Sequence, residues 1–150
     1  MEAARRTLIL GVGNLLLGDE GVGVHAARRL AAVPLPSGVE VLDGGTGGFQ
    51  LLSLFQEYDP IILIDATMDG EPPGTVKLLR PKFAGEFPRT LSAHDIGLRD
   101  LLETAQLLGS LPTLYLITVS IAEIQQMTME LSPPVAASLK AVERIVMEIV

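Results

Sequence analysis

Short apolar runs alternate with amphipathic stretches along most of the chain. Runs of the length and residue type expected of buried strands occupy 7–10, 39–42, 61–64, 75–79 and 113–119. Between these runs, apolar residues recur at the spacing of one helix face, which predicts helices over 21–32, 47–56, 94–108 and from 133 to the end. Strand and helix therefore alternate, as they do in domains with a parallel sheet.

This alternation predicts one α/β domain over residues 1–150, with helices on both sides of a mostly parallel, five-stranded sheet. The segment 75–79 follows the tight turn Pro72-Pro73-Gly74, so we expect it to return as an antiparallel strand beside 61–64. The loop predicted over 81–88 leads to the third helix. The expected architecture is a three-layer α/β/α domain.

The amino-acid composition excludes several classes of function. The chain has 150 residues and a net charge of −7 with only 11 Lys and Arg, which argues against nucleic acid as a partner. It has no cysteine, which excludes disulfides, thiolate metal sites and a cysteine nucleophile. It also lacks the run of about 18 apolar residues that a membrane span needs. We expect a cytoplasmic protein without a membrane partner.

The segment 11–21 (GVGNLLLGDEG) carries the strongest local signal. A strand leads into a glycine-rich turn and a helix, as in dinucleotide-binding sites, where the helix N-terminus receives a pyrophosphate. Here Asp19 and Glu20 occupy that place. Because carboxylates repel a phosphate and attract a cation, the segment favours a cation site.

Polar residues follow several strands at the edge where function gathers in open α/β sheets. Glu20 follows the first strand, Asp43 ends the second, and Asp65 ends the third. His94 lies near the start of a helix that leads into a parallel strand, so that helix must begin at the same edge. We therefore expect these four side chains to converge.

Each residue also has a structural interpretation. Asp19 is interpreted as an acid at a helix N-terminus, and Asp43 as either functional or a cap of its own Asp-Gly-Gly turn. Glu20 is interpreted as functional, because the glycines around it should leave room for another molecule. Asp65 follows an apolar strand, where an unpaired carboxylate is costly. His25 is expected on the surface of the first helix.

Two carboxylates and one imidazole suit a borderline divalent metal such as nickel, zinc, iron or manganese. A set of only three ligands, Glu20, Asp65 and His94, leaves coordination positions open for a substrate or water. The residues alone leave three classes of protein open: a metal-dependent or metal-recognising hydrolase, a dinucleotide-binding Rossmann-like protein, and a non-catalytic metal-binding scaffold. The dinucleotide signal is weak because Leu16 stands where the fingerprint needs its third glycine.

Four motifs, in order and at matching spacing, resemble those of the hydrogenase maturation endopeptidases. They are 11–24 (GVGNLLLGDEGVGV), 43–46 (DGGT), 62–66 (ILIDA) and 92–98 (SAHDIGL). The resemblance covers essentially the whole chain. It implies a twisted five-stranded sheet between helices and an enzyme that removes a C-terminal extension from the precursor of a nickel–iron hydrogenase large subunit.

The resemblance also implies roles for single residues. The family's metal-contacting residues correspond to Glu20, Asp65 and His94, and its Asp-Gly-Gly aspartate corresponds to Asp43. Among these, Glu20, Asp65 and Asp43 are the catalytic candidates, of an aspartic or metallo type of peptidase. The nickel would come with the substrate, and zinc or cadmium is expected to bind in vitro. The implied partner is the precursor protein, and we expect the peptidase to be a monomer.

Overall fold

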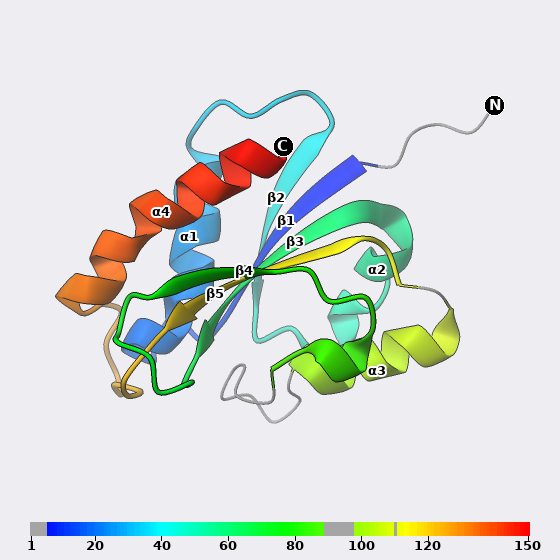
Figure 1. The fold of residues 1–150 in the computed structure, drawn as a ribbon. Coiled ribbons are helices and arrows are strands. Elements are labelled where there is room, and N and C mark those ends of the chain that lie inside the picture. Colours follow the sequence, from blue (N-terminus) through cyan, green and yellow to red (C-terminus); the bar gives the residue numbers. More distant parts are fainter. Residues whose placement is uncertain (1–5, 89–97, 110) are drawn as a thin grey trace.

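A five-stranded sheet forms the centre of the molecule, in the order β2-β1-β3-β5-β4 (Figure 1). The computed structural model describes residues 6–88, 98–109 and 111–150. The strands are β1 (Arg6–Val12), β2 (Val39–Gly45), β3 (Tyr58–Thr67), β4 (Val76–Leu79) and β5 (Leu114–Ser120). Four of them are parallel, and β4 runs antiparallel to β5. The predicted mixed, mostly parallel sheet is confirmed.

The position of β4 differs from the prediction. We expected this strand beside β3, but it pairs with β5, with Val76 opposite Val119. The reason is that β5 itself takes the free side of β3, with Asp65 opposite Thr118. Because β4 can then only extend the sheet outward, it becomes the edge strand.

The helices match the predicted pattern less evenly than the strands. They are α1 (Val22–Ala31), α2 (Leu54–Glu57), α3 (Leu98–Leu108) and α4 (Pro133–Ile149), with short 3-10 turns η1 (Gly18–Gly21), η2 (Gly48–Leu51) and η3 (Ala84–Glu86). The helix predicted over 47–56 is split into η2 and α2, and η3 lies in the predicted loop. Within the described chain, no helix has the length and apolar character that a membrane crossing requires.

Two apolar cores lie on opposite faces of the sheet. Along β1, Leu8 and Leu10 belong to the core under α2 and α3, while Ile9 belongs to the core under α1 and α4. This alternation follows from the period of two along a strand. Figure 1 shows α1 and α4 on one side of the sheet and α2 and α3 on the other. The predicted three layers are therefore present.

Two glycines let α1 lie directly on the sheet. A Cβ added to Gly11 in β1 would be 2.1 Å from the carbonyl oxygen of Gly23 in α1. A Cβ added to Gly23 would be 2.2 Å from the carbonyl oxygen of Ile64 in β3. No side chain fits at either place, so the start of α1, and η1 before it, are held against the carboxyl ends of β1 and β3.

Candidate active site

The carboxyl ends of the three adjacent parallel strands β2, β1 and β3 meet at one edge of the sheet. Gly11 of β1 pairs with Asp43 of β2 on one side and with Ile64 of β3 on the other. The backbone of Asp43 is therefore level with Ile64, about two strand spacings or roughly 10 Å away. Asp65 is the next residue along β3, so its side chain points to the opposite face of the sheet from those of Ile64 and Asp43. Glu20, in η1, follows β1 at the same edge.

The carboxyl group of Asp65 is fully buried and only partly hydrogen-bonded. Its side chain is 0% exposed, its Oδ1 accepts a hydrogen bond from the backbone N–H of Ala66 at 2.8 Å, and its Oδ2 has no hydrogen-bond partner among the described residues. Burial and then the negative charge of Glu20 raise the pKa of Asp65 well above its ordinary value, and the Ala66 N–H only partly opposes this. A cation bound beside Asp65 would offset both the cost of burying its charge and the repulsion from Glu20.

Glu20 is held in place by the motif that carries it. It is 1% exposed, and its Oε2 accepts a hydrogen bond from the backbone N–H of Asn14 at 2.5 Å. The backbone N–H of Glu20 donates to the carbonyl of Leu17 at 3.2 Å. The turn before α1 therefore fixes the position of this carboxylate, and its charge acts on Asp65.

The neighbouring acid, Asp19, has a structural role across the fold. Its Oδ1 accepts from the backbone N–H of Ser132 and its Oδ2 from the Ser132 hydroxyl, both at 2.7 Å, while the amide of Gln125 donates to Oδ2 at 3.0 Å. A structural role was predicted, but within its own helix rather than toward α4. Ser132 does occupy the N-cap of α4, and its side chain makes no capping hydrogen bond.

The glycines around Glu20 do not leave the room that we expected. A Cβ on Gly18 would be 2.4 Å from Oε1 of Gln125, and a Cβ on Gly21 would be 2.8 Å from the carbonyl oxygen of Asn14. The protein's own chain fills the space that a ligand was expected to use. That prediction was wrong, and these glycines serve packing.

Asp43 has partners that match the turn interpretation. Its side chain is exposed, its Oδ1 accepts from the backbone N–H of Gly45 at 3.0 Å, and its Oδ2 pairs with Nε of Arg28 at 3.2 Å. The carboxylate therefore caps its own Asp-Gly-Gly turn and links β2 to α1. Its catalytic role stays a prediction.

The two histidines have different outcomes. His94, the predicted third ligand, lies outside the described residues, and no three His, Cys, Asp or Glu side chains within 6–88, 98–109 and 111–150 are grouped to hold a metal ion. His25 is half-buried instead of exposed, and burial lowers its pKa while a hydrogen bond to the backbone of Met129 opposes the shift. The surface prediction for His25 was wrong because the chain between β5 and α4 covers it.

The residues that hold the carboxylates had no clear signal in the sequence. Asn14, whose backbone N–H donates to Glu20, belongs to the glycine-rich motif, and nothing in the local sequence marks it as the partner of that carboxylate. Gln125 and Ser132, which bind Asp19, are more than 100 positions away along the chain. Only the folded structure brings them together.

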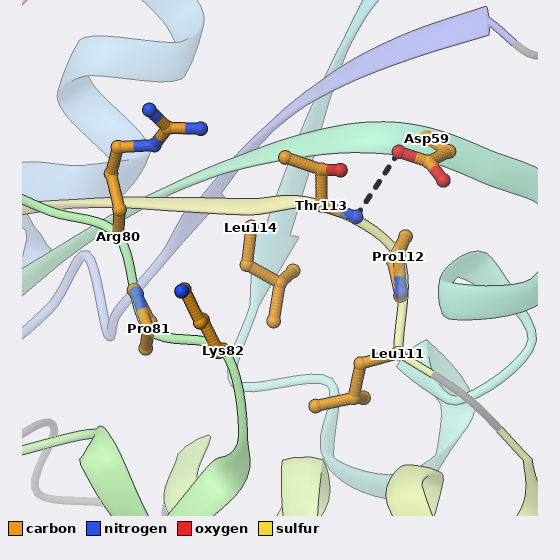
Figure 2. A pocket seen from close by; sticks show the side chains of 8 residues that line it. All are labelled: Asp59, Arg80, Pro81, Lys82, Leu111, Pro112, Thr113 and Leu114. Atoms are coloured by element: carbon orange, nitrogen blue, oxygen red, sulfur yellow. Dashed lines mark hydrogen bonds between the residues drawn. The ribbon is translucent and has the colours of Figure 1, made fainter.

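A pocket of about 600 Å³ lies where β3 and β5 begin, at the other end of the strands from the carboxylates. It is lined by Asp59, Arg80, Pro81, Lys82, Leu111, Pro112, Thr113 and Leu114, which Figure 2 shows around the ends of three strands. Asp59 accepts a hydrogen bond from the backbone N–H of Thr113 at 3.1 Å, and Arg80 lies 4.9 Å above the ring of Tyr115. Because parallel strands β3 and β5 begin here, this pocket is separate from the candidate site.

Known proteins resemble this chain along most of its length. The model of the family described as "Hydrogenase maturation protease" matches residues 24–149. The hydrogenase expression/formation protein HupD of Rhodobacter capsulatus is 39% identical over 89% of this chain, which spans 66% of that relative. The hydrogenase 2 maturation protease of Escherichia coli is 36% identical over 90% of this chain and 84% of its own.

The fold agrees with these sequence matches. The solved structure of the hydrogenase maturating endopeptidase HybD from E. coli has a TM-score of 0.82 and 36% identity, covering 94% of this chain and 89% of that one. The family and the class of enzyme predicted from the four motifs, a hydrogenase maturation endopeptidase, are thereby confirmed. The chain belongs to the hydrogenase maturation protease family.

Proposed function

We propose that this protein removes the C-terminal extension of a nickel-loaded hydrogenase large-subunit precursor. Family membership supports the class of reaction and substrate. The observation that carries the proposal is the buried pair of acids, in which Asp65 leaves Oδ2 without a hydrogen-bond partner among the described residues and lies within the field of Glu20. Such a pair is unfavourable alone and favourable beside a cation.

The nickel belongs to the substrate in this proposal. Glu20, Asp65 and His94 bind the ion that the precursor already holds, and the ion thereby positions the scissile bond at the carboxyl edge of β1 and β3. Carboxylate oxygens and imidazole nitrogen are suitable ligands for nickel, and three ligands leave positions for those of the precursor. A precursor without nickel lacks the ion that these residues bind, and it stays uncut.

Hydrolysis needs a water whose proton is removed and an amine that receives one. In the proposed reaction, water attacks the scissile carbonyl, a carboxylate of the Glu20–Asp65 pair takes the proton, and the departing amine receives it when the C–N bond breaks. Nickel held by the precursor at this site would supply Lewis-acid polarisation of the carbonyl. Asp43, which is anchored by Gly45 and Arg28, orients the substrate strand rather than transferring protons.

The dinucleotide alternative has less support. A phosphate at the start of α1 would face Glu20 and Asp19, both of which are buried there. Titration with reduced nicotinamide cofactor should therefore leave the melting temperature unchanged, and a clear increase would favour that alternative.

The monomeric state remains a prediction, which light scattering of the purified protein would test.

The proposed function is tested by mixing the enzyme with nickel-loaded precursor and following the released peptide by mass spectrometry. Wild type should release one C-terminal peptide, and Glu20→Gln should slow release by at least about 100-fold, since it removes a charge from the site. Glu57→Gln, on the exposed last residue of α2, is the matched control and should cleave like wild type. Full cleavage by Glu20→Gln would contradict the assignment.

A further inference from the structure

Three large apolar side chains are exposed together beside the candidate site. Leu16 is 52% exposed, Met127 is 87% exposed and Met129 is 53% exposed. They come from two distant parts of the sequence, the glycine-rich motif and the connection between β5 and α4. We refer to these three residues as the methionine patch.

A short parallel bridge joins the two segments. Leu17 pairs with Thr128, through hydrogen bonds from Gly18 N–H to the Thr128 carbonyl at 2.9 Å and from Thr128 N–H to the Leu16 carbonyl at 3.1 Å. Exposure alternates across the bridge, because Leu17 and Thr128 are half-buried while the residues next to them in the patch are exposed. The bridge therefore sets the three patch side chains outward as neighbours.

The conformation of the patch is held by the surrounding structure. Met127 has a φ of 56°, a left-handed conformation that costs a residue with a side chain roughly 1 kcal/mol or more. Gln125, two residues before it, binds both the backbone N–H and the carboxylate of Asp19. On the other side, Met129 is held by the hydrogen bond between its backbone and His25. Several contacts thus keep the exposed Met127 in a strained backbone conformation.

The patch is connected to Glu20 through Asn14. The backbone N–H of Leu16 donates to the side-chain oxygen of Asn14 at 3.0 Å, and the N–H of Asn14 donates to the Glu20 carboxylate. The N–H of Glu20 binds the carbonyl of Leu17, the residue in the bridge. Figure 1 shows the connection between β5 and α4 at the same end of the molecule as the start of α1.

We propose that the methionine patch docks an apolar stretch of the hydrogenase large-subunit precursor next to its metal. This rests on the proposed function, because the precursor is the partner that must reach Glu20. Exposed apolar clusters mark interaction sites, and methionine adapts its shape to a partner while burying apolar area. Contact with the patch would position the metal at Glu20 and Asp65 before the peptide bond is cut.

The test compares Met127→Gly with wild type on nickel-loaded precursor. Glycine removes the side chain and tolerates the positive φ, so the melting temperature should be kept or raised. KM should increase about tenfold, with a much smaller change in kcat, and Leu16→Ala should act in the same direction. Met147→Ala is the matched control, because this exposed methionine lies near the end of α4 at the opposite edge of the sheet. It should leave both constants unchanged.

A footprint separates docking from catalysis. Hydroxyl radicals should oxidise Met127 less when nickel-loaded precursor is bound, relative to Met147 in the same sample. Unchanged KM in both patch variants, with no protection of Met127, would overturn the docking proposal while wild-type cleavage upheld the proposed function. A wild type that binds the precursor and protects Met127 without cutting it would support docking and contradict the peptidase assignment.

Discussion

The carboxyl groups of Glu20 and Asp65 are buried at the same edge of the sheet, and the charge of Glu20 helps to raise the pKa of Asp65. No described side chain donates a hydrogen bond to Oδ2 of Asp65. The pair is therefore less stable by itself than with a cation between its members.

Removing the Asp65 charge should stabilise the metal-free protein and stop its activity. Asp65→Asn keeps the shape of the side chain, so we expect a gain of about 1–3 kcal/mol in the free energy of unfolding at pH 7, the usual scale for a buried polar group. Thermal unfolding measures the gain, and peptide release measures the activity. The exposed Asp100→Asn is the control. A variant that is both less stable and fully active would contradict the role assigned to Asp65.

The free energy of unfolding should depend on pH differently in wild type and in Asp65→Asn. Because the pKa of Asp65 is raised in the folded state, the folded protein keeps a proton that the unfolded chain releases above about its ordinary value of 3.8. The stabilising contribution of this group is present below that pH and is lost as the pH rises through the folded pKa. Denaturant unfolding at a series of pH values should show that the free energy of unfolding falls with rising pH in wild type and does not fall in this way in Asp65→Asn. Parallel curves for the two proteins would contradict the raised pKa of Asp65.

Asp43→Asn should affect catalysis only modestly. The variant keeps an oxygen for the Gly45 N–H but weakens the ion pair with Arg28. If Asp43 orients the substrate, kcat should fall less than tenfold, whereas loss of a general acid or base typically costs about 10²–10⁴-fold. Steady-state cleavage of nickel-loaded precursor measures the difference. A fall of 100-fold or more would make Asp43 a proton-transfer residue.

Asp19→Ala should destabilise the fold more than it alters the chemistry. The substitution leaves the N–H and hydroxyl of Ser132 and the amide of Gln125 without their acceptor, at a cost of about 2–4 kcal/mol. Ser132→Ala removes only the hydroxyl and should cost about 1 kcal/mol. Urea unfolding of both variants gives the comparison, and equal losses would show that Asp19 does not join η1 to α4.

Gly23→Ala should be poorly tolerated. The added Cβ would lie 2.2 Å from the carbonyl oxygen of Ile64 and 2.4 Å from that of Val12, and backbone in the middle of a sheet cannot move aside. We expect a loss of more than about 3 kcal/mol. Gly109→Ala is the matched control, since the added Cβ meets nothing within 4 Å there. Soluble expression and melting temperature measure both, and two equally stable variants would contradict the close seating of α1.

The strands and the edge that carries the site could be predicted from the sequence because they depend on local patterns. The run before Asp65 is apolar throughout, which indicates a strand buried on both faces, and the acid that ends it had to lie at the carboxyl edge. Glu20 followed from the same rule applied to β1. Parallel pairing then brought Asp43 to the same edge.

What the sequence did not reveal depends on contacts between distant segments. The pairing of β4 with β5 required knowing that β5 occupies the edge of β3. The glycines of the first motif looked like room for a ligand because nothing local shows that Gln125 packs against Gly18. His25 looked exposed for the same reason, since the segment around Met129 covers it.

In the proposed reaction, the nickel ion of the precursor is what Glu20 and Asp65 bind. The most direct measurement is the cleavage rate of one precursor preparation, divided into a nickel-loaded and a nickel-free portion, with wild-type enzyme at equal concentrations. The loaded portion should release the C-terminal peptide, and the nickel-free portion should release it at least about 100-fold more slowly, with recovery when nickel is restored. Equal cleavage of the two portions would contradict this role of nickel.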